Sequence, residues 1–203
     1  MKESSKKYYN HPIELVIIGG SSGSIMVLME IFKNLKPNIQ FPILIIIHRL
    51  KTGKSKLIDV FQKSTSLKVE ECNEKINLKP GSIYIAPEDY HVLIENNKTI
   101  SLDISEPINY SRPSIDVSFQ SAATVYKSNL AAFLLTGANK DGAEGLFAVF
   151  NNNGFCAIQN LNEAEINTMP KAAKKIFNVL ELTTLEISEY INKFTPIHEK
   201  HTS

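Results

Sequence analysis

The sequence predicts an α/β fold: a doubly wound, mostly parallel sheet with helices on both faces and a small β-hairpin insertion. Short apolar runs rich in β-branched residues occur at 13–18, 41–47 and 130–135, and such runs are typical of strands that are buried on both faces of a sheet. A helical spacing of apolar side chains follows the first run over 25–35 and stops at Pro37. Strands that alternate with helices in this way favour a parallel, doubly wound sheet.

The rest of the chain continues this alternation. We expect further strands around Val69 and over 83–86 and 154–158, and helices near 57–61, 113–126, 142–150, 169–177 and 186–194. The segments 91–95 and 99–104 flank Asn96-Asn97-Lys98, a sequence that suits a tight turn, and they predict the hairpin.

Length and composition indicate one globular domain. The chain has 203 residues, of which 43% are hydrophobic, enough for a single sizeable core. We interpret residues 12–194 as this domain, with a flexible arm at 1–11 and a tail at 195–203.

Charge and cysteine content narrow the function classes. The 22 basic and 21 acidic side chains leave a net charge of +1, which gives no electrostatic reason to expect nucleic acid as a partner. No apolar run is long enough to cross a membrane, and the N-terminus lacks the apolar region of a secretory signal. The two cysteines, Cys72 and Cys156, form no disulfide framework, so we expect a cytoplasmic protein. We expect no cofactor and no metal, because no cluster of His, Cys, Asp or Glu has ligand spacing.

Three polar residues follow predicted strands and are candidates for catalysis. Ser21 follows the first strand, His48 ends the second, and Asp141 follows the strand at 130–135. Because the carboxyl ends of parallel strands meet at one edge of the sheet, we expect all three there. A serine nucleophile needs a base, and a histidine base needs a carboxylate to fix its tautomer. The expected geometry places Ser21 Oγ near one ring nitrogen of His48 and Asp141 on the other.

The segment Gly19-x-Ser21-x-Gly23 matches the nucleophile elbow, a sharp turn between a strand and a helix. The same glycines also suit a phosphate-binding or purely structural turn. A dinucleotide site is a weaker alternative, because the second glycine of its pattern is missing and the next strand ends in His48-Arg49 rather than in an acid.

Each candidate also has an ordinary structural interpretation. His48 could be a hydrogen-bonded loop residue, and Asp141 could cap the following helix. His91 is an alternative base at the start of the hairpin. The two cysteines are poor nucleophile candidates, since Cys72 has no paired histidine and Cys156 lies in a predicted buried strand.

Several motifs together resemble the catalytic domain of the chemotaxis protein-glutamate methylesterases of the CheB type. The matching stretches are IIGGSSGS at 17–24, IIIHR at 45–49, LKPGSIYIAPEDYHV at 78–92, RPSIDVSFQSAA at 112–123, LLTGANKDGAEGL at 134–146, and the later pairs Gln159-Asn160 and Met169-Pro170. The resemblance extends from about Ile13 to Leu182 in the family's order.

This resemblance implies a serine hydrolase that removes methyl groups from glutamate γ-methyl esters, and that can also deamidate glutamines, on the cytoplasmic helices of chemoreceptors or on a related methylated protein. It places Ser21 on the nucleophile, His48 on the general base and Asp141 on the orienting carboxylate. It places Ser22 and Ala138 beside the oxyanion.

The resemblance also puts Arg112 near the cleft, as part of the RPS motif. The sequence departs from the family in two motifs. GGSSGS replaces a pattern nearer GASTGG, and Ala138 and Asn139 replace the methionine and glycine of TGMGxDG, which affects the acyl pocket.

Two further expectations concern regulation and the competing function. Since the first strand begins by Ile13, we expect no receiver domain ahead of it, so that the activity is constitutive, is controlled by a separate protein, or serves another methylation system. The alternative function is a catalytically silent module of the same fold that binds receptor helices.

Overall fold

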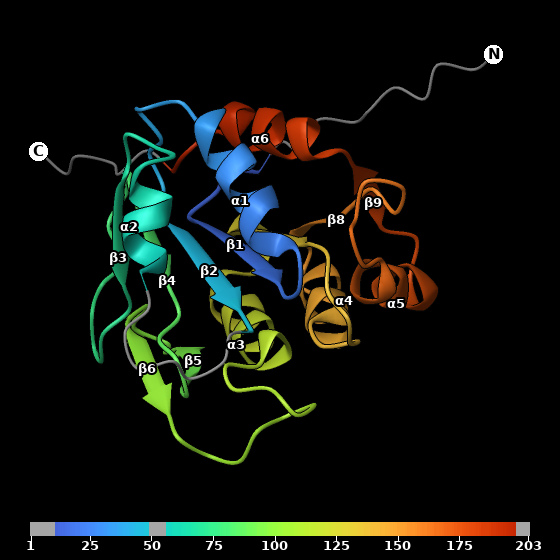
Figure 1. Cartoon of the computed structure of the whole chain (residues 1–203). Helices are drawn as coiled ribbons and strands as arrows, with labels where there is room; N and C mark the ends of the chain where they lie inside the picture. The colour runs from blue at the N-terminus through green and yellow to red at the C-terminus, as the bar shows by residue number, and fades with distance from the viewer. Residues whose placement is uncertain (1–10, 49–55, 198–203) are drawn as a thin grey trace, which may run out of the picture.

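The computed structural model describes residues 11–48 and 56–197, and it confirms the predicted fold class. Seven parallel strands form one sheet in the order β3-β4-β2-β1-β7-β8-β9, and β5 and β6 form a separate antiparallel hairpin (Figure 1). The strands are β1 (Leu15–Gly20), β2 (Ile43–Ile47), β3 (Lys68–Glu71), β4 (Ser82–Ile85), β5 (His91–Ile94), β6 (Ile100–Asp103), β7 (Leu130–Leu134), β8 (Phe155–Gln159) and β9 (Leu180–Leu182). The helices are α1 (Ser24–Lys33), α2 (Leu57–Gln62), α3 (Ile115–Tyr126), α4 (Ala143–Asn151), α5 (Thr168–Ile176) and α6 (Thr184–Lys193), with a 3₁₀ turn at Lys127–Asn129.

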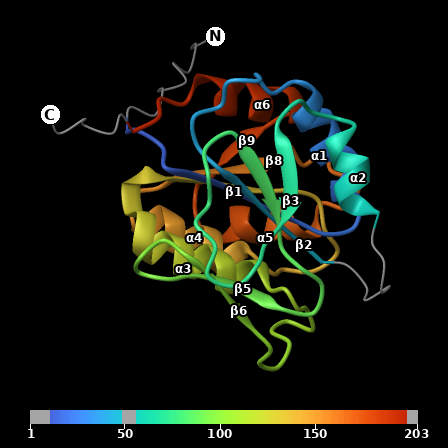
Figure 2. The same cartoon turned by 90° about the vertical axis from the view of Figure 1, so that its left-hand side faces the viewer.

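The sheet lies between two layers of helices (Figures 1 and 2). Helices α1, α2 and α6 cover one face, and α3, α4 and α5 cover the other. Strand β1 shows how the sequence specifies both layers, because its side chains alternate between the two cores. Val16 and Ile18 pack toward α1, and Leu15 and Ile17 pack toward α3.

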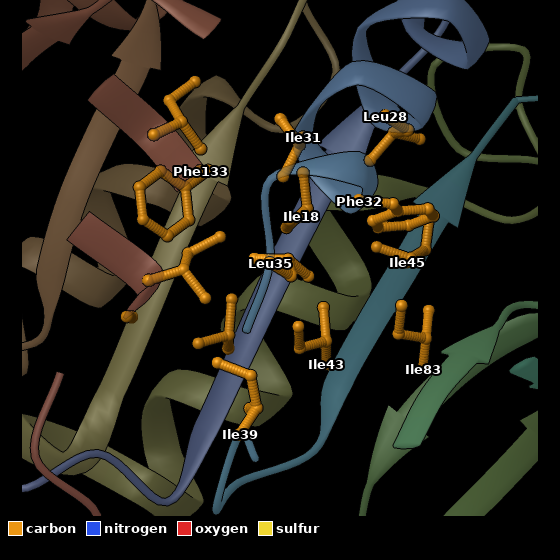
Figure 3. Packing of buried hydrophobic residues seen from close by; sticks show 14 of the residues in the cluster. Ile18, Leu28, Ile31, Phe32, Leu35, Ile39, Ile43, Ile45, Ile83 and Phe133 are labelled. Carbon is orange, nitrogen blue, oxygen red and sulfur yellow. The ribbon is translucent and has the colours of Figure 1, made fainter. Parts of the chain in front are cut away.

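The core under α1 is built from branched aliphatic side chains. Figure 3 shows Leu28, Ile31 and Phe32 of α1 lying over Ile18 of β1 and Ile45 of β2. These side chains are essentially inaccessible to solvent. A strand buried on both faces tolerates few polar residues before its end, so the polar groups of this sheet collect at the strand ends.

The hairpin of β5 and β6 packs against α3 rather than joining the main sheet. Ser118 of α3 donates a hydrogen bond to Val92 O at 2.7 Å, and Ser121 Oγ accepts one from Ile94 N at 3.1 Å. The hairpin therefore fixes the segment between β6 and α3, which borders the carboxyl ends of β1, β2 and β7.

The first and last described segments meet at the opposite edge of the sheet, where β1 begins. Ile13 N donates to Thr195 O at 2.7 Å, so the first residues of the predicted tail pair with the start of the domain. The predicted arm, apart from His11, and the tail beyond 197 lie outside the described residues, as does Arg49. No helix in the described part of the chain is long and apolar enough to span a membrane.

Candidate active site

The turn after β1 holds Ser21 at the sheet edge. Ser24 N and Ser24 Oγ both donate to Ser21 O, at 2.9 and 2.6 Å, and close a tight turn into α1. Gly23 occupies the turn position that requires a positive φ, here 83°, which glycine adopts without a steric penalty. Ser21 N donates to Thr136 O at 2.9 Å, and this bond ties the turn to the end of β7.

His48 continues β2 on the strand next to β1. Gly20 pairs with Ile47 in the parallel register, and His48 N donates to Gly20 O at 3.2 Å. His48 therefore lies beside the Ser21 turn, as neighbouring strands separated by about 4.8 Å require. Its ring nitrogen Nε2 lies 2.7 Å from Asp141 Oδ2.

The Asp141 carboxylate is fully buried at the N-terminus of α3. Ile115 N donates to Asp141 Oδ2 at 2.7 Å, while Asp116 N and Ser114 Oγ donate to Oδ1 at 3.2 and 2.9 Å. Free N–H groups and the helix dipole make a helix N-terminus a site for negative charge. Asp141 is thus held as an anion by α3 in addition to its contact with His48.

Two glycines allow α3 to approach this closely. A Cβ atom on Gly19 would lie 2.4 Å from Ile115 Cγ2, and one on Gly142 would lie 2.6 Å from the same atom. Any larger residue at either position would push the first turn of α3 away. The glycines of two separate motifs therefore bring the α3 N–H groups within reach of Asp141.

The two buried carboxyls here have opposite pKa shifts. Burial alone would raise the pKa of Asp141, but the hydrogen bonds from His48 and Ile115 N hold it below its usual value. Burial raises the pKa of Asp116 to about 6, with a further contribution from the nearby Asp141 charge and against the hydrogen bond from Gly145 N. Asp141 is accordingly the carboxylate suited to orienting a histidine.

The second ring nitrogen of His48 does not meet Ser21. His48 Nδ1 lies 3.3 Å from Ser111 Oγ, and Asn139 Nδ2 lies 3.5 Å from the same hydroxyl. Among the described residues, no hydrogen bond joins Ser21 Oγ to His48. The expected contact of Asp141 with one ring nitrogen is present, and the expected contact of Ser21 with the other is not. Hydroxyl–imidazole contacts of this kind often tighten only when substrate is bound.

Ser111 reaches His48 because of a tight turn before α3. Ile108 and Ser111 exchange backbone hydrogen bonds of 3.2 and 2.9 Å, with Asn109 and Tyr110 between them. Both central residues have positive φ, 50° and 61°, a conformation that costs free energy for side chains other than glycine. Asn109 Nδ2 lies 3.3 Å from Asp116 Oδ2 and 3.5 Å from Asp141 Oδ1, and these contacts hold the turn over the site.

Backbone donors for an oxyanion are present beside Ser21. Within the described residues, the N–H groups of Ser22 and Ala138 have no hydrogen-bond acceptor, and both residues are exposed. Gly137 N donates to Ile166 O at 3.0 Å and is not free. A Cβ atom on Gly137 would lie 3.0 Å from Ser21 Cβ and 2.6 Å from Met169 Cε, so this glycine brings the two segments together.

Arg112 and His91 hold the loops around the site in place through their hydrogen bonds. Arg112 donates to Asp89 Oδ1 through Nε at 3.0 Å, and to the carbonyls of Ile104 and Ser105 through Nη1. His91 is buried, and its Nδ1 accepts from Ser114 N at 3.1 Å. Its other ring nitrogen contacts Glu106 O at 3.2 Å. Both nitrogens of His91 are therefore used, which removes it as an alternative base.

Sequence reasoning did not assign roles to Ser111, Asn109, Ser114 or Met169. Ser114 lies in the RPSID motif, directly before an apolar run. A serine at this position is typical of a helix N-cap, and this pattern could have identified it. Asn109 is a residue type that tolerates positive φ, but it is followed by Tyr110 rather than by glycine, so the sequence does not indicate a turn with two left-handed residues. In the part of the chain that the structure describes, no cluster of His, Cys, Asp or Glu could hold a metal ion.

Comparisons with known proteins identify the family of this chain. The model of the CheB methylesterase family matches residues 16–191. A protein of Leptospira interrogans, provisionally assigned by its name as a protein-glutamate methylesterase/protein-glutamine glutaminase, is 39% identical over 173 residues, 85% of this chain and 90% of that protein. The protein-glutamate methylesterase/protein-glutamine glutaminase of Thermotoga maritima is 36% identical over 163 residues, 78% of this chain and 47% of that protein.

The fold comparison leads to the same family. The crystal structure of the Thermotoga maritima CheB methylesterase catalytic domain matches with a TM-score of 0.85 and 31% identity, over 90% of this chain and 99% of that one. The resemblance inferred from the motifs is confirmed by the matched family model, the relatives and the fold. The chain belongs to the CheB methylesterase family.

Proposed function

We propose that this protein is a protein-glutamate methylesterase that hydrolyses glutamate γ-methyl esters on chemoreceptors by a Ser-His-Asp mechanism. The observation that carries the proposal is the His48–Asp141 pair, 2.7 Å apart, at the strand end beside Ser21. A buried anion on one ring nitrogen fixes the histidine tautomer and stabilises the imidazolium that forms during catalysis.

In the proposed mechanism His48 Nδ1 takes the proton of Ser21 Oγ as the oxygen attacks the ester carbonyl carbon. The N–H groups of Ser22 and Ala138 donate to the oxyanion of the tetrahedral intermediate. His48 then returns the proton to the leaving oxygen, and methanol departs. A water molecule, deprotonated by His48, hydrolyses the glutamyl ester of Ser21 and restores the free serine.

The same groups can deamidate glutamine. The amide nitrogen takes the place of the methoxy oxygen, His48 protonates it, and ammonia leaves. The relatives from Leptospira interrogans and Thermotoga maritima carry both activities in their names. We extend both activities to this chain.

Ser111 supports a second candidate function, a catalytically silent module that binds receptor helices. Its hydroxyl, rather than that of Ser21, lies against His48 Nδ1 at 3.3 Å. A site in which this contact persisted would leave Ser21 without a base. We favour the esterase because Ser21 has free oxyanion donors beside it.

We also propose a cytoplasmic location, with the cytoplasmic helices of a methylated receptor as the partner. Both cysteines are free thiols, Cys72 buried and Cys156 partly buried. Burial raises the pKa of each thiol far above its usual value, so neither is a reactive thiolate. Unpaired cysteines fit a reducing compartment.

The decisive experiment measures methanol release from a receptor-derived peptide that carries a glutamyl γ-methyl ester. The wild type should release methanol, and Ser21→Ala should release none while keeping its thermal transition. A serine-directed phosphonate should label the wild type at Ser21, as mapped by mass spectrometry. Methanol release by Ser21→Ala would disprove the assigned nucleophile, and a wild type that neither labels nor releases methanol would support the silent module.

A further inference from the structure

A cavity of about 630 Å³ opens between α4, α5 and the turn before α3, and Asn109 in its wall lies 3.5 Å from the buried Asp141 carboxylate. Figure 1 shows α4 and α5 side by side at this end of the molecule. Asn109 and Asp116, which contact each other, belong to its wall. A volume of several hundred Å³ is in the range of ligand-binding sites. The cavity therefore adjoins the catalytic site but contains neither Ser21 nor His48.

The polar wall of this cavity carries three lysines. Lys140 precedes Asp141 in the chain, and Lys171 and Lys175 lie four residues apart on one face of α5. Among the described residues, none of the three makes an ion pair. Lys174 of the same helix, by contrast, lies outside the cavity and pairs with Glu181. Three lysines without an ion pair among the described residues thus line one cavity.

The two acidic residues of the wall offset the charge of the three lysines only in part. Asp116 is only 8% exposed, and its Oδ1 accepts from Gly145 N at 2.7 Å. Glu144 is exposed in the first turn of α4 and makes no ion pair among the described residues. Positive charges outnumber negative charges on the wall, and a low-dielectric concave site strengthens their attraction for an anion.

We propose that this cavity binds a carboxylate side chain of the substrate polypeptide, close in sequence to the glutamyl ester that Ser21 attacks. The inference rests on the proposed function, because it assigns the flanking residues of that substrate. The loop that carries Lys140 and the helix α5 that carries Lys171 and Lys175 both contain residues next to the catalytic groups. Lys140 is next to Asp141, and α5 places Met169 against Gly137 beside Ser21. On a helical substrate, residues three or four positions from the ester lie on the same face.

The test compares two peptides that carry the same glutamyl γ-methyl ester. One has Glu at the third and fourth positions on both sides, and the other has Gln there. The enzymes are the wild type, the double variant Lys171→Gln/Lys175→Gln, and Lys174→Gln as the matched control on the same helix. The ratio of kcat/KM for the Glu peptide to that for the Gln peptide is the measured quantity. We expect a ratio of about ten for the wild type and the control, and of about one for the double variant.

A binding measurement tests this inference independently of whether the protein is an active esterase. Fluorescence anisotropy of the two labelled peptides is measured on Ser21→Ala, with and without the double lysine substitution. A preference for the Glu peptide that the lysine substitutions remove supports the cavity, even if the wild type releases no methanol and the esterase proposal fails. Equal binding of both peptides to Ser21→Ala, or a preference that survives the lysine substitutions, overturns the inference.

Discussion

His48 Nε2 lies 2.7 Å from Asp141 Oδ2, so Nδ1 is the ring nitrogen left for proton transfer. In the chymotrypsin triad the arrangement is the reverse, with the aspartate on Nδ1 and the serine near Nε2. The two nitrogens can exchange roles because a triad is defined by geometry. Here β2 brings the His48 backbone against Gly20, and Asp141 arrives from the far side on the loop after β7.

The first prediction concerns Asp141→Asn. An amide at this position has no charge to hold the Nε2–H tautomer of His48, so we expect kcat for methyl-ester hydrolysis to fall by about 10³–10⁴. Stability should fall as well, because the amide NH₂ group would face the donors of Ile115 or Ser114. Methanol release and urea denaturation measure the two effects. Asp59→Asn, an exposed acid of α2, is the control that should change neither, and near wild-type kcat in Asp141→Asn would contradict the triad.

A second prediction distinguishes Ser21 from Ser111. If the Ser111 hydroxyl only occupies His48 Nδ1 in the absence of substrate, Ser111→Ala should keep kcat within about tenfold of the wild type, since one weak neutral hydrogen bond is lost. Ser21→Ala should abolish methanol release. A loss of all activity in Ser111→Ala, with phosphonate labelling of Ser111 in the wild type, would instead make Ser111 the nucleophile.

Gly137→Ala provides the third prediction. The new methyl group would lie 2.6 Å from Met169 Cε and 3.0 Å from Ser21 Cβ, so it must displace one or both side chains. Overpacking of this kind costs about 1–3 kcal/mol of stability, and displacement of Ser21 should lower kcat by about a hundredfold.

The double variant Gly137→Ala/Met169→Ala separates the two contacts. It relieves the clash with Met169 but not the one with Ser21. Met169 is fully buried, so Met169→Ala has a stability cost of its own, and this single variant is the reference. In that background Gly137→Ala should cost less stability in urea denaturation than it does in the wild type, while its effect on kcat should persist. Full recovery of kcat would show that the alanine does not disturb Ser21.

The sequence predicted the parts of this site that strands position. Ser21, His48 and Asp141 each follow a strand with an unambiguous apolar pattern, and parallel topology brings such positions together. The contact of Ser111 with His48 was not predictable, because it depends on the left-handed backbone of Asn109 and Tyr110. Asparagine tolerates that conformation, but tyrosine has no local preference for it, so tertiary contacts must impose it on Tyr110.

Short strands and exact helix boundaries could not be predicted from the sequence either. The prediction missed β9, which has only three residues, since its edge position leaves too little apolar pattern to detect. The helix expected from residue 113 begins at Ile115, after the N-cap Ser114. That shift matters for the site, because it places the free N–H groups of Ile115 and Asp116 against Asp141.

The last prediction concerns Asp116 and the pH dependence of stability. Burial raises the pKa of this carboxyl to about 6 in the folded state, from an ordinary value of 3.8. The folded state then binds more protons than the unfolded state between these two values, so this group's contribution to stability falls as the pH rises from about 4 through about 6. A shift of this size corresponds to about 3 kcal/mol. Asp116→Asn removes the contribution.

The free energy of unfolding of the wild type minus that of Asp116→Asn should therefore decrease from pH 4 to pH 7 and level off above it. Urea denaturation at unit pH intervals measures the difference. Asp103→Asn is the control of opposite sign. Hydrogen bonds from Ser105 lower the pKa of the partly exposed Asp103, so its contribution to stability is present above its ordinary pKa and is lost as the pH falls. Parallel stability curves for the wild type and Asp116→Asn across this range would show that Asp116 is ionised in the folded protein as readily as in the unfolded chain.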